Sequence, residues 1–173
     1  DFTYIKADGK WYYFCIVMDL FSRKIISWNI SGKPDVDLVM TAFKKAYTKR
    51  NAPLGLMFHS DRGTQYTAFA FRQLLDCLNV VQSFSKKGYP FDNACCECFF
   101  KYLKKEEVNR KTYHCSNSSY QCLNTLKDSI MPRDHIVLSE WWHQMKKKNG
   151  TGHSSKQLYS ALFLYKLCPF YWL

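Results

Sequence analysis

Residues 1–31, DFTYIKADGKWYYFCIVMDLFSRKIISWNIS, decide the fold of this chain. Residues 1–6 form a short alternating segment, and the Asp-Gly pair at 8–9 is a strong signal for a hairpin turn. The runs at 11–19 and 23–31 are rich in aromatic and β-branched residues, which favour strands. The stretch therefore predicts three consecutive strands in a meander.

The period of the apolar residues changes after this meander. Apolar side chains recur at helical spacing at positions 36, 39, 40, 43 and 47. Asp35 precedes them and is a suitable N-terminal cap. The run LGLMFH at 54–59 then predicts a buried strand, because a near-continuous apolar run is typical of a central parallel position.

The next segments complete an alternating α/β order. We expect a helix across 67–78, a short strand near 80–84 and a further helix that starts at Asp92 or Asn93. This order predicts an α/β fold with a mixed five-stranded sheet flanked by helices on both faces. A helix near 117–130 and a linker or disordered segment at 146–156 follow.

Composition limits the class of protein. The 173 residues suffice for one domain, and 47% hydrophobic residues indicate a globular chain. Lys and Arg number 25 against 14 acidic residues, a net charge of +11. Such an excess favours a polyanionic partner, nucleic acid first and an anionic membrane second. An ordinary basic protein is the alternative.

The eight cysteines match no disulfide framework and are interpreted as reduced thiols of a cytosolic protein. Cys95 and Cys98 form a C-x-x-C pair, with His114 and Cys115 downstream, so a zinc site is conceivable. The pair lies in a helical pattern and no second such pair exists, which argues against zinc. The apolar stretch 158–173 is too short to span a membrane.

Asp61 lies in HSDRG at 59–63, where the buried strand ends. The carboxyl ends of strands in α/β sheets are where ligands bind, so Asp61 is a candidate catalytic residue. Alternatively, Asp61 makes an Asx-turn before Gly63.

Two further acidic residues stand at notable places. Glu97 lies early in an apolar helix, where a carboxylate is costly to desolvate unless it binds a cation, although it could instead point to solvent. Asp1 begins the first strand, where propensity disfavours it. Between Asp1 and Asp61 lie 59 residues, and between Asp61 and Glu97 lie 35. Carboxylates on a strand, a strand end and a helix could hold two magnesium ions.

Four segments carry a family resemblance, in order: DFTYI at 1–5, WYYFCIVMDLFSRKIISW at 11–28, HSDRGTQY at 59–66 and SFSKKGYPFDNACCECFFKYLKKE at 83–106. They resemble the integrase-like catalytic core of bacterial insertion-sequence transposases, which carry an Asp, Asp, 35-residue gap, Glu signature and are relatives of retroviral integrases. The resemblance implies an RNase H-like fold and assigns the catalytic, metal-holding roles to Asp1, Asp61 and Glu97. Asp19 matches a non-catalytic position at the hairpin.

The resemblance also implies the chemistry. A water or a 3′-hydroxyl attacks a DNA phosphodiester in line, with two Mg²⁺ or Mn²⁺ ions assisting. Asp1 would bridge both ions, while Asp61 and Glu97 would each hold one. The implied partners are transposon ends and target DNA, with a homo-oligomer assembled on the DNA. The implied location is the bacterial cytoplasm, at the nucleoid.

Basic and polar residues surround these carboxylates in the sequence. Lys101 and Lys104 follow Glu97 at helical spacing, with Lys105 at the edge of the same face. Together with Lys86 and Lys87 on the preceding loop, they could form a phosphate track, or they could be ordinary solvated lysines.

Four polar or aromatic residues are expected to support the site or position DNA. They are His59, Gln65, Tyr66 and Asn93. For His59, a satisfied core histidine is an equal alternative.

The resemblance fades after about residue 107. The family carries a downstream Tyr-Asn and Arg-x-His pattern, of which only Arg133 and His135 occur here. We therefore divide the chain into a core at 1–131 and a divergent tail at 132–173 that is disordered or read from a shifted frame. The chain begins at Asp1 without the family's upstream strand and DNA-binding region, which predicts a fragment with poor activity. A decayed fragment that only binds DNA non-specifically is the alternative function. A different RNase H-like nuclease is a less favoured one.

Overall fold

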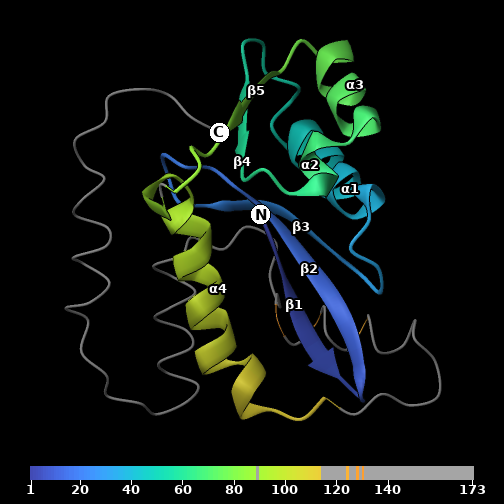
Figure 1. Ribbon diagram of the computed structural model, residues 1–173, viewed down its shortest axis with the longest axis vertical. Helices are drawn as coiled ribbons and strands as arrows, with labels where there is room; N and C mark the ends of the chain where they lie inside the picture. The colour runs from blue at the N-terminus through green and yellow to red at the C-terminus, as the bar shows by residue number, and fades with distance from the viewer. Residues whose placement is uncertain (89, 114–123, 125–127, 129, 131–173) are drawn as a thin grey trace.

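The computed structural model describes residues 1–88, 90–113, 124, 128 and 130 (Figure 1). The elements, in chain order, are β1 (Phe2–Ala7), β2 (Lys10–Met18), β3 (Ile25–Ser31), α1 (Val36–Lys49), β4 (Met57–Ser60), α2 (Thr64–Thr67), α3 (Phe69–Cys77), β5 (Val81–Phe84), the 3-10 turn η1 (Pro90–Asn93), α4 (Ala94–Glu106) and the 3-10 turn η2 (Val108–Arg110). This order confirms the predicted alternation of strands and helices.

The meander forms as predicted, with β1, β2 and β3 paired antiparallel in that order. Asp8 and Gly9 make the two-residue turn between β1 and β2, at φ values of 48° and 73°. Both angles lie in the left-handed region, which tight hairpin turns require and which Asp-Gly pairs tolerate well.

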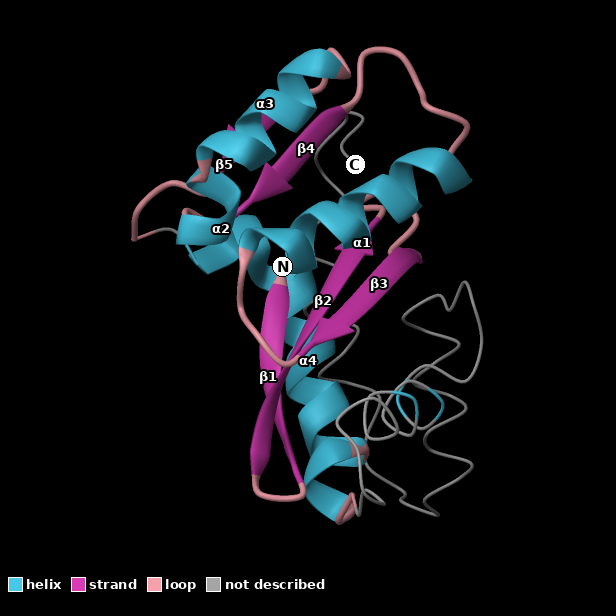
Figure 2. Cartoon of the chain, turned by 90° about the vertical axis from the view of Figure 1, so that its right-hand side faces the viewer, coloured by secondary structure: helices cyan, strands magenta, loops and turns pink. Residues whose placement is uncertain are grey.

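β2 has buried side chains on both faces of the sheet, which explains its long apolar run. Its even-numbered residues pack towards α4, and its odd-numbered residues pack towards α1, β4 and α3. The even set is Tyr12, Phe14, Ile16 and Met18, and the odd set is Tyr13, Cys15 and Val17. Figures 1 and 2 show the result, with α4 along one face of the meander and α1 across the other.

The five predicted strands are present, but they hydrogen-bond as two sheets among the described residues. β1–β2–β3 form one sheet, while β4 and β5 form a parallel pair. The single five-stranded sheet is therefore corrected to a three-stranded and a two-stranded sheet. Side chains rather than backbone hydrogen bonds join them, because Phe58 of β4 packs in one core with Cys15 of β2 and Phe2 of β1.

β4 is also shorter than the predicted strand at 54–59. Leu54 is 94% exposed, and Gly55 turns the chain at a φ of 70°. A left-handed residue interrupts extended backbone, so the strand begins only after it. The helix predicted across 67–78 is likewise divided, because Ala68 is extended between α2 and α3.

Asp19 lies in the turn between β2 and β3, where the sequence placed it. Its Oδ1 accepts hydrogen bonds from the backbone nitrogens of Phe21 at 2.9 Å and Ser22 at 3.2 Å. Its other oxygen pairs with Arg50, which follows α1. Asp19 therefore ties the turn to the end of α1 and has a structural role in this geometry.

Asp35 caps α1 as predicted, because its Oδ1 accepts a hydrogen bond from the backbone nitrogen of Leu38 at 3.1 Å. Replacing Asp35 with alanine is expected to lower the free energy of unfolding by about 1 kcal/mol, since one helix donor loses its partner. Urea denaturation would measure this. Asp37→Ala is the matched control: it removes an acidic residue from the same helical turn without removing the cap and should cost less than half as much. Equal losses would show that charge, not the cap, matters.

Several sequence predictions fall outside the described residues. They include the linker at 146–156, the tail at 132–173, the Arg133/His135 pair and the possible zinc ligands His114 and Cys115. Of the helix expected near 117–130, only Asn124, Asp128 and Ile130 are described, and each is helical. The five described cysteines are free thiols, as expected. No helix within the described ranges is long and apolar enough to cross a membrane.

Candidate active site

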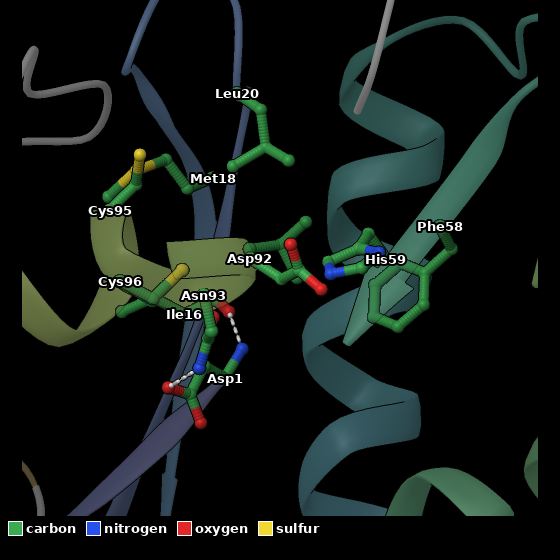
Figure 3. Close-up of a pocket in the computed structure, with 11 residues that line it drawn as sticks. Asp1, Ile16, Met18, Leu20, Phe58, His59, Asp92, Asn93, Cys95 and Cys96 are labelled. Carbon is green, nitrogen blue, oxygen red and sulfur yellow. Dashed lines mark hydrogen bonds between the residues drawn. The ribbon is translucent and has the colours of Figure 1, made fainter. Parts of the chain in front are cut away.

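A small pocket opens where the start of β1, the end of β2, β4 and the start of α4 meet (Figure 3). Its volume is about 30 Å³, enough to hold a water molecule. The lining residues are Asp1, Ile16, Val17, Met18, Leu20, Phe58, His59, Asp92, Asn93, Cys95 and Cys96. Two predicted supporting residues, His59 and Asn93, therefore share a pocket with the predicted metal ligand Asp1.

Asp1 is held in place on three sides. Its backbone nitrogen donates to the carbonyl of Ile16 at 3.1 Å, and its carbonyl accepts from the Ile16 nitrogen at 2.9 Å. Its Oδ1 accepts from the backbone nitrogen of Phe2 at 2.7 Å, and its Oδ2 accepts from Nδ2 of Asn93 at 2.8 Å (Figure 3). The carboxylate is thus oriented by a residue 92 positions away in sequence.

Asn93 occupies the N-cap position of α4, but its side chain makes no capping hydrogen bond. Asparagine is a favoured capping residue because its side-chain oxygen can accept from a helix N–H. Here its amide donates to Asp1 instead. The Asn93 side chain therefore orients the Asp1 carboxylate and does not cap α4.

Asp61 follows directly after β4, as predicted. Its Oδ1 accepts from the backbone nitrogen of Gly63 at 2.9 Å, so it makes the Asx-turn that was the alternative interpretation. A Cβ on Gly63 would lie 3.1 Å from that oxygen and 3.2 Å from Oε1 of Gln65, which is tighter than ordinary contact. Because Gly63 has no Cβ, the Asp61 carboxylate has room to approach the Gly63 backbone nitrogen.

Tyr66 is buried beside Asp61 and does not reach solvent. It is 1% exposed, its ring packs against Phe58 and Phe71, and its hydroxyl lies 3.9 Å from the Cys15 sulfur. Burial raises the pKa of Tyr66 well above its usual range, and nearby Cys15 and Asp61 raise the pKa further. In this structure Tyr66 is a core residue, whereas the sequence predicted that it supports the site or positions DNA.

Glu97 lies on the exposed side of α4. It is four residues after Asn93, so the two side chains project from the same face of the helix one turn apart. Cys96, its neighbour, faces inward and lines the pocket. Burial raises the pKa of the Cys96 thiol, which keeps it protonated at neutral pH. The exposed position matches the alternative interpretation of Glu97, a side chain that points to solvent.

In the structure, the carboxylates of the three predicted metal ligands do not lie together. Among these residues, no group of three or more His, Cys, Asp or Glu side chains is placed to hold a metal ion. Asp1 is bound by Asn93, Asp61 by the Gly63 backbone, and Glu97 is turned outward. The expected convergence of these carboxylates is absent from this arrangement. Asp1 lines the pocket, while Asp61 follows β4 and Glu97 lies on α4, two elements that border it.

His59 is a satisfied, half-buried histidine that also lines the pocket. Its Nδ1 lies 3.0 Å from the Ser83 hydroxyl, and its Nε2 lies 3.2 Å from the Ser85 hydroxyl. These contacts link β4 to β5 and the loop that follows. Across the pocket, the Asp92 carboxyl group faces the His59 ring (Figure 3). Burial lowers the pKa of His59, which Asp92 partly offsets.

The lowered pKa of His59 predicts a pH dependence of stability. Below its ordinary pKa of 6.5, the unfolded chain binds a proton that the folded chain does not. Stability is therefore complete above about pH 6.5 and decreases as the pH falls towards the folded pKa of His59. His59→Asn should make the decrease in melting temperature between pH 7 and pH 5 shallower than in the wild type. Superimposable pH profiles would show that His59 does not contribute.

The remaining predicted residues have simpler roles here. Gln65 donates through Nε2 to the Pro34 carbonyl at 2.7 Å and ties α2 to the loop before α1. Lys87, Lys101 and Lys105 are exposed. The Lys86 backbone nitrogen donates to Asp92 at 2.9 Å, and the Lys104 ammonium lies 4.1 Å from the centroid of the Tyr4 ring.

Asp92 is the pocket residue that sequence reasoning missed. It precedes Asn93 and was considered only as a helix start. Its carboxylate holds the loop at Lys86 and faces His59, so it connects both sides of the pocket. The signal available was its place in the PFDNA segment, next to the residue that holds Asp1.

The α/β fold carries acidic residues just before β1, directly after β4 and in the first turn of α4, the order that the resemblance to an RNase H-like integrase core implies. Residues 1–90 match the family described as the integrase core domain, and the chain belongs to this family. It is 38% identical over 109 residues to the transposase for insertion sequence element IS904 of Lactococcus lactis. That match covers 63% of this chain and 43% of the relative.

A second relative supports the assignment, and a solved structure shares the fold. The chain is 39% identical over 109 residues to transposase InsF for insertion sequence IS3A of Escherichia coli, covering 63% of this chain and 38% of the relative. The matches therefore span about two fifths of each relative. A chain in the cryo-EM structure of the simian T-cell lymphotropic virus intasome with PP2A regulatory subunit B56 gamma shares the fold, with a TM-score of 0.51 at 14% identity. That likeness covers 74% of this chain and 45% of the other.

Proposed function

We propose that this chain is the catalytic core of an insertion-sequence transposase that cuts and joins DNA strands. The observation that carries the proposal is the hydrogen bond from Asn93 to Asp1 at 2.8 Å. It fixes the start of α4 against the start of β1, which brings the helix that carries Glu97 to the strand that follows Asp1. Within the described residues, nothing favours the alternative of a decayed fragment.

The side chains of the three predicted ligands have the chemistry that binds a divalent metal ion. Asp1, Asp61 and Glu97 offer carboxylate oxygens, which Mg²⁺ and Mn²⁺ prefer, whereas the Cys96 thiol beside them is protonated. We propose that these three carboxylates hold two ions. The ions would supply an activated attacking oxygen and stabilise the leaving oxygen of the phosphodiester. Because the carboxylates are not gathered here, ion binding requires their side chains to reorient.

Neighbouring residues of the chain orient the proposed metal ligands. Asn93 and the Phe2 nitrogen orient Asp1. Asp92 holds the loop before α4 through the Lys86 nitrogen, which sets the position of the helix start. His59, kept neutral by its lowered pKa, adds no positive charge that would compete with the ions.

A function on DNA needs a path for the phosphate backbone. Lys101 and Lys104 follow Glu97 along one face of α4, with Lys105 beside them, and Lys86 and Lys87 stand on the loop before the helix. We propose that these lysines contact phosphates. The proposed partners are transposon ends and target DNA, in a homo-oligomer assembled on the DNA, in the bacterial cytoplasm at the nucleoid.

Replacing Lys101 with alanine is expected to weaken duplex DNA binding and to reduce the slope of log K against log salt by about one unit, since one phosphate contact is lost. Fluorescence anisotropy at several salt concentrations measures the slope. Lys44→Ala is the control, because Lys44 is exposed on α1, across the sheet from α4. Equal slopes for wild type and Lys101→Ala would show that Lys101 is a solvent-exposed lysine that does not contact DNA.

The function is tested by incubating the chain with a supercoiled plasmid and a labelled duplex oligonucleotide. We expect nicked plasmid and label joined to plasmid, in the presence of Mg²⁺ or Mn²⁺ and not of a chelator. Asp61→Asn serves as the blank. Product formation that is equal in wild type and blank would contradict the proposal.

A further inference from the structure

The β1–β2 hairpin carries a pair of exposed aromatic side chains away from the pocket. Tyr4 is 55% exposed and Trp11 is 50% exposed. Their ring centroids lie 5.3 Å apart with the planes nearly perpendicular, at 84°. Rings of this size usually lose most of their surface on folding, so an adjacent exposed pair suggests a binding surface.

Two lysines accompany these rings, one from β1 and one from α4. The Lys6 ammonium lies 5.7 Å from the centroid of the Trp11 ring, and the Lys104 ammonium lies 4.1 Å from that of Tyr4. We call Tyr4, Lys6, Trp11 and Lys104 the hairpin aromatic surface. Its aromatic faces and positive charges together match a partner with flat rings and negative charges.

One structural role of the lysines is protection of an edge strand. Asp1 and Ile16 exchange both backbone hydrogen bonds, so by alternation the backbone groups of Tyr4 and Lys6 face the outer edge of the sheet. Lysines at such an edge oppose pairing with another strand. Edge protection accounts for the charge of Lys6 on β1, but it does not account for Lys104 on α4 or for two exposed aromatic rings.

The hairpin aromatic surface continues from the proposed active site. α4 and β1 run in the same direction, from Asn93 and Asp1 at the pocket to Lys104 and Tyr4 (Figure 1). At the rise of a strand, Tyr4 lies about 10 Å along β1 from Asp1. Lys101 stands on α4 between Glu97 and Lys104. Tyr4 and Trp11 stand on the face of the meander that α4 does not cover, and the Lys104 ammonium reaches the Tyr4 ring from α4.

We propose that the hairpin aromatic surface binds an unpaired DNA strand that leads away from the reacting phosphate. Its bases would stack on Trp11 and Tyr4, while Lys6 and Lys104 would move from the rings to the phosphates. Unpaired bases fit because their faces are free to stack, whereas bases in a duplex already stack on each other. This inference rests on the proposed function for the choice of DNA as partner.

The test compares two replacements of Trp11 in the full chain. Trp11→Phe keeps a stacking face, and Trp11→Leu keeps apolar surface without one. Binding of a labelled twenty-nucleotide oligothymidylate is measured by anisotropy, with a duplex of equal length in parallel. We expect Trp11→Leu to bind the single strand about tenfold more weakly, Trp11→Phe to stay within about threefold of wild type, and duplex binding to be unchanged.

Phe21→Leu and Phe69→Leu are matched controls, because these rings are 82% and 72% exposed and lie off the hairpin aromatic surface. The proposal is overturned if Trp11→Leu and Trp11→Phe bind the oligonucleotide equally well. It is also overturned if duplex binding falls as far as single-strand binding, or if a control loses as much. Melting curves of each variant confirm folding, which these exposed positions should not disturb.

The result is separable from the proposed function. If the chain joins DNA in a metal-dependent reaction but the two Trp11 variants bind the oligonucleotide equally well, only this inference is contradicted. If oligonucleotide binding depends on Trp11 but the chain does not join DNA, only the proposed function as a transposase core is contradicted.

Discussion

Replacing Glu97 with glutamine is expected to reduce metal-dependent DNA cleavage and joining by about a thousandfold or more. The substitution keeps the shape of the side chain and removes the negative charge that would hold an ion. Losing an ion that stabilises the leaving oxygen removes several kcal/mol of transition-state stabilisation, and about 4 kcal/mol corresponds to a thousandfold. Glu97 is exposed on α4, so the fold should not change.

Three further variants test whether the loss of activity is specific to the proposed metal ligands. Asp61→Asn should lose a similar amount, and the double variant should lose little more than either single variant, because residues that act as a unit are not additive. Asp76→Asn, at an exposed position on α3, should keep full activity. If Glu97→Gln retained more than a tenth of the wild-type rate, Glu97 would not be a metal ligand.

Replacing Tyr66 with alanine is expected to lower the free energy of unfolding by about 3–5 kcal/mol, the usual cost of removing a large buried aromatic ring. Tyr66 is 1% exposed and packs against Phe58 of β4 and Phe71 of α3. It therefore supports the strand that ends at Asp61. Urea denaturation of both proteins would measure the loss.

Tyr66→Phe separates packing from hydrogen bonding. It keeps the ring and removes only the hydroxyl, whose recorded contact is the Cys15 sulfur at 3.9 Å, a weak interaction. We expect this variant to lose less than about 1 kcal/mol and to bind DNA like the wild type. Weaker DNA binding by a fully folded Tyr66→Phe variant would restore the role in DNA contact that the sequence suggested.

The local pattern was sufficient to predict most of the elements. The Asp-Gly turn at 8–9, the cap at Asp35 and the strand character of β2 each depend on nearby residues and were predicted correctly. The strand at 54–59 was predicted too long, because Gly55 is compatible with an apolar run yet adopts a left-handed φ of 70° here. The division into two sheets also escaped prediction, since it depends on long-range pairing.

The structure brings two of the predicted site residues together. Asp1 and Asn93 were named from separate motifs, and the structure joins them at 2.8 Å. Spacing does not determine side-chain rotamers, so the turn of Asp61 onto Gly63 and the outward position of Glu97 could not be derived. Tyr66 stands in the same motif as Asp61, but burial depends on α3 and β4 packing around it, which the motif does not contain.

The central claim is that Asp1, Asp61 and Glu97 together form a divalent-metal site, and Mn²⁺-dependent thermal stability tests it most directly. An ion that binds only the folded chain raises the melting temperature in proportion to the logarithm of its concentration above the dissociation constant. We predict such a rise for the wild type and for Asp76→Asn, and its loss in Glu97→Gln and in Asp61→Asn. A Glu97→Gln variant that responds to Mn²⁺ as strongly as the wild type would contradict the account.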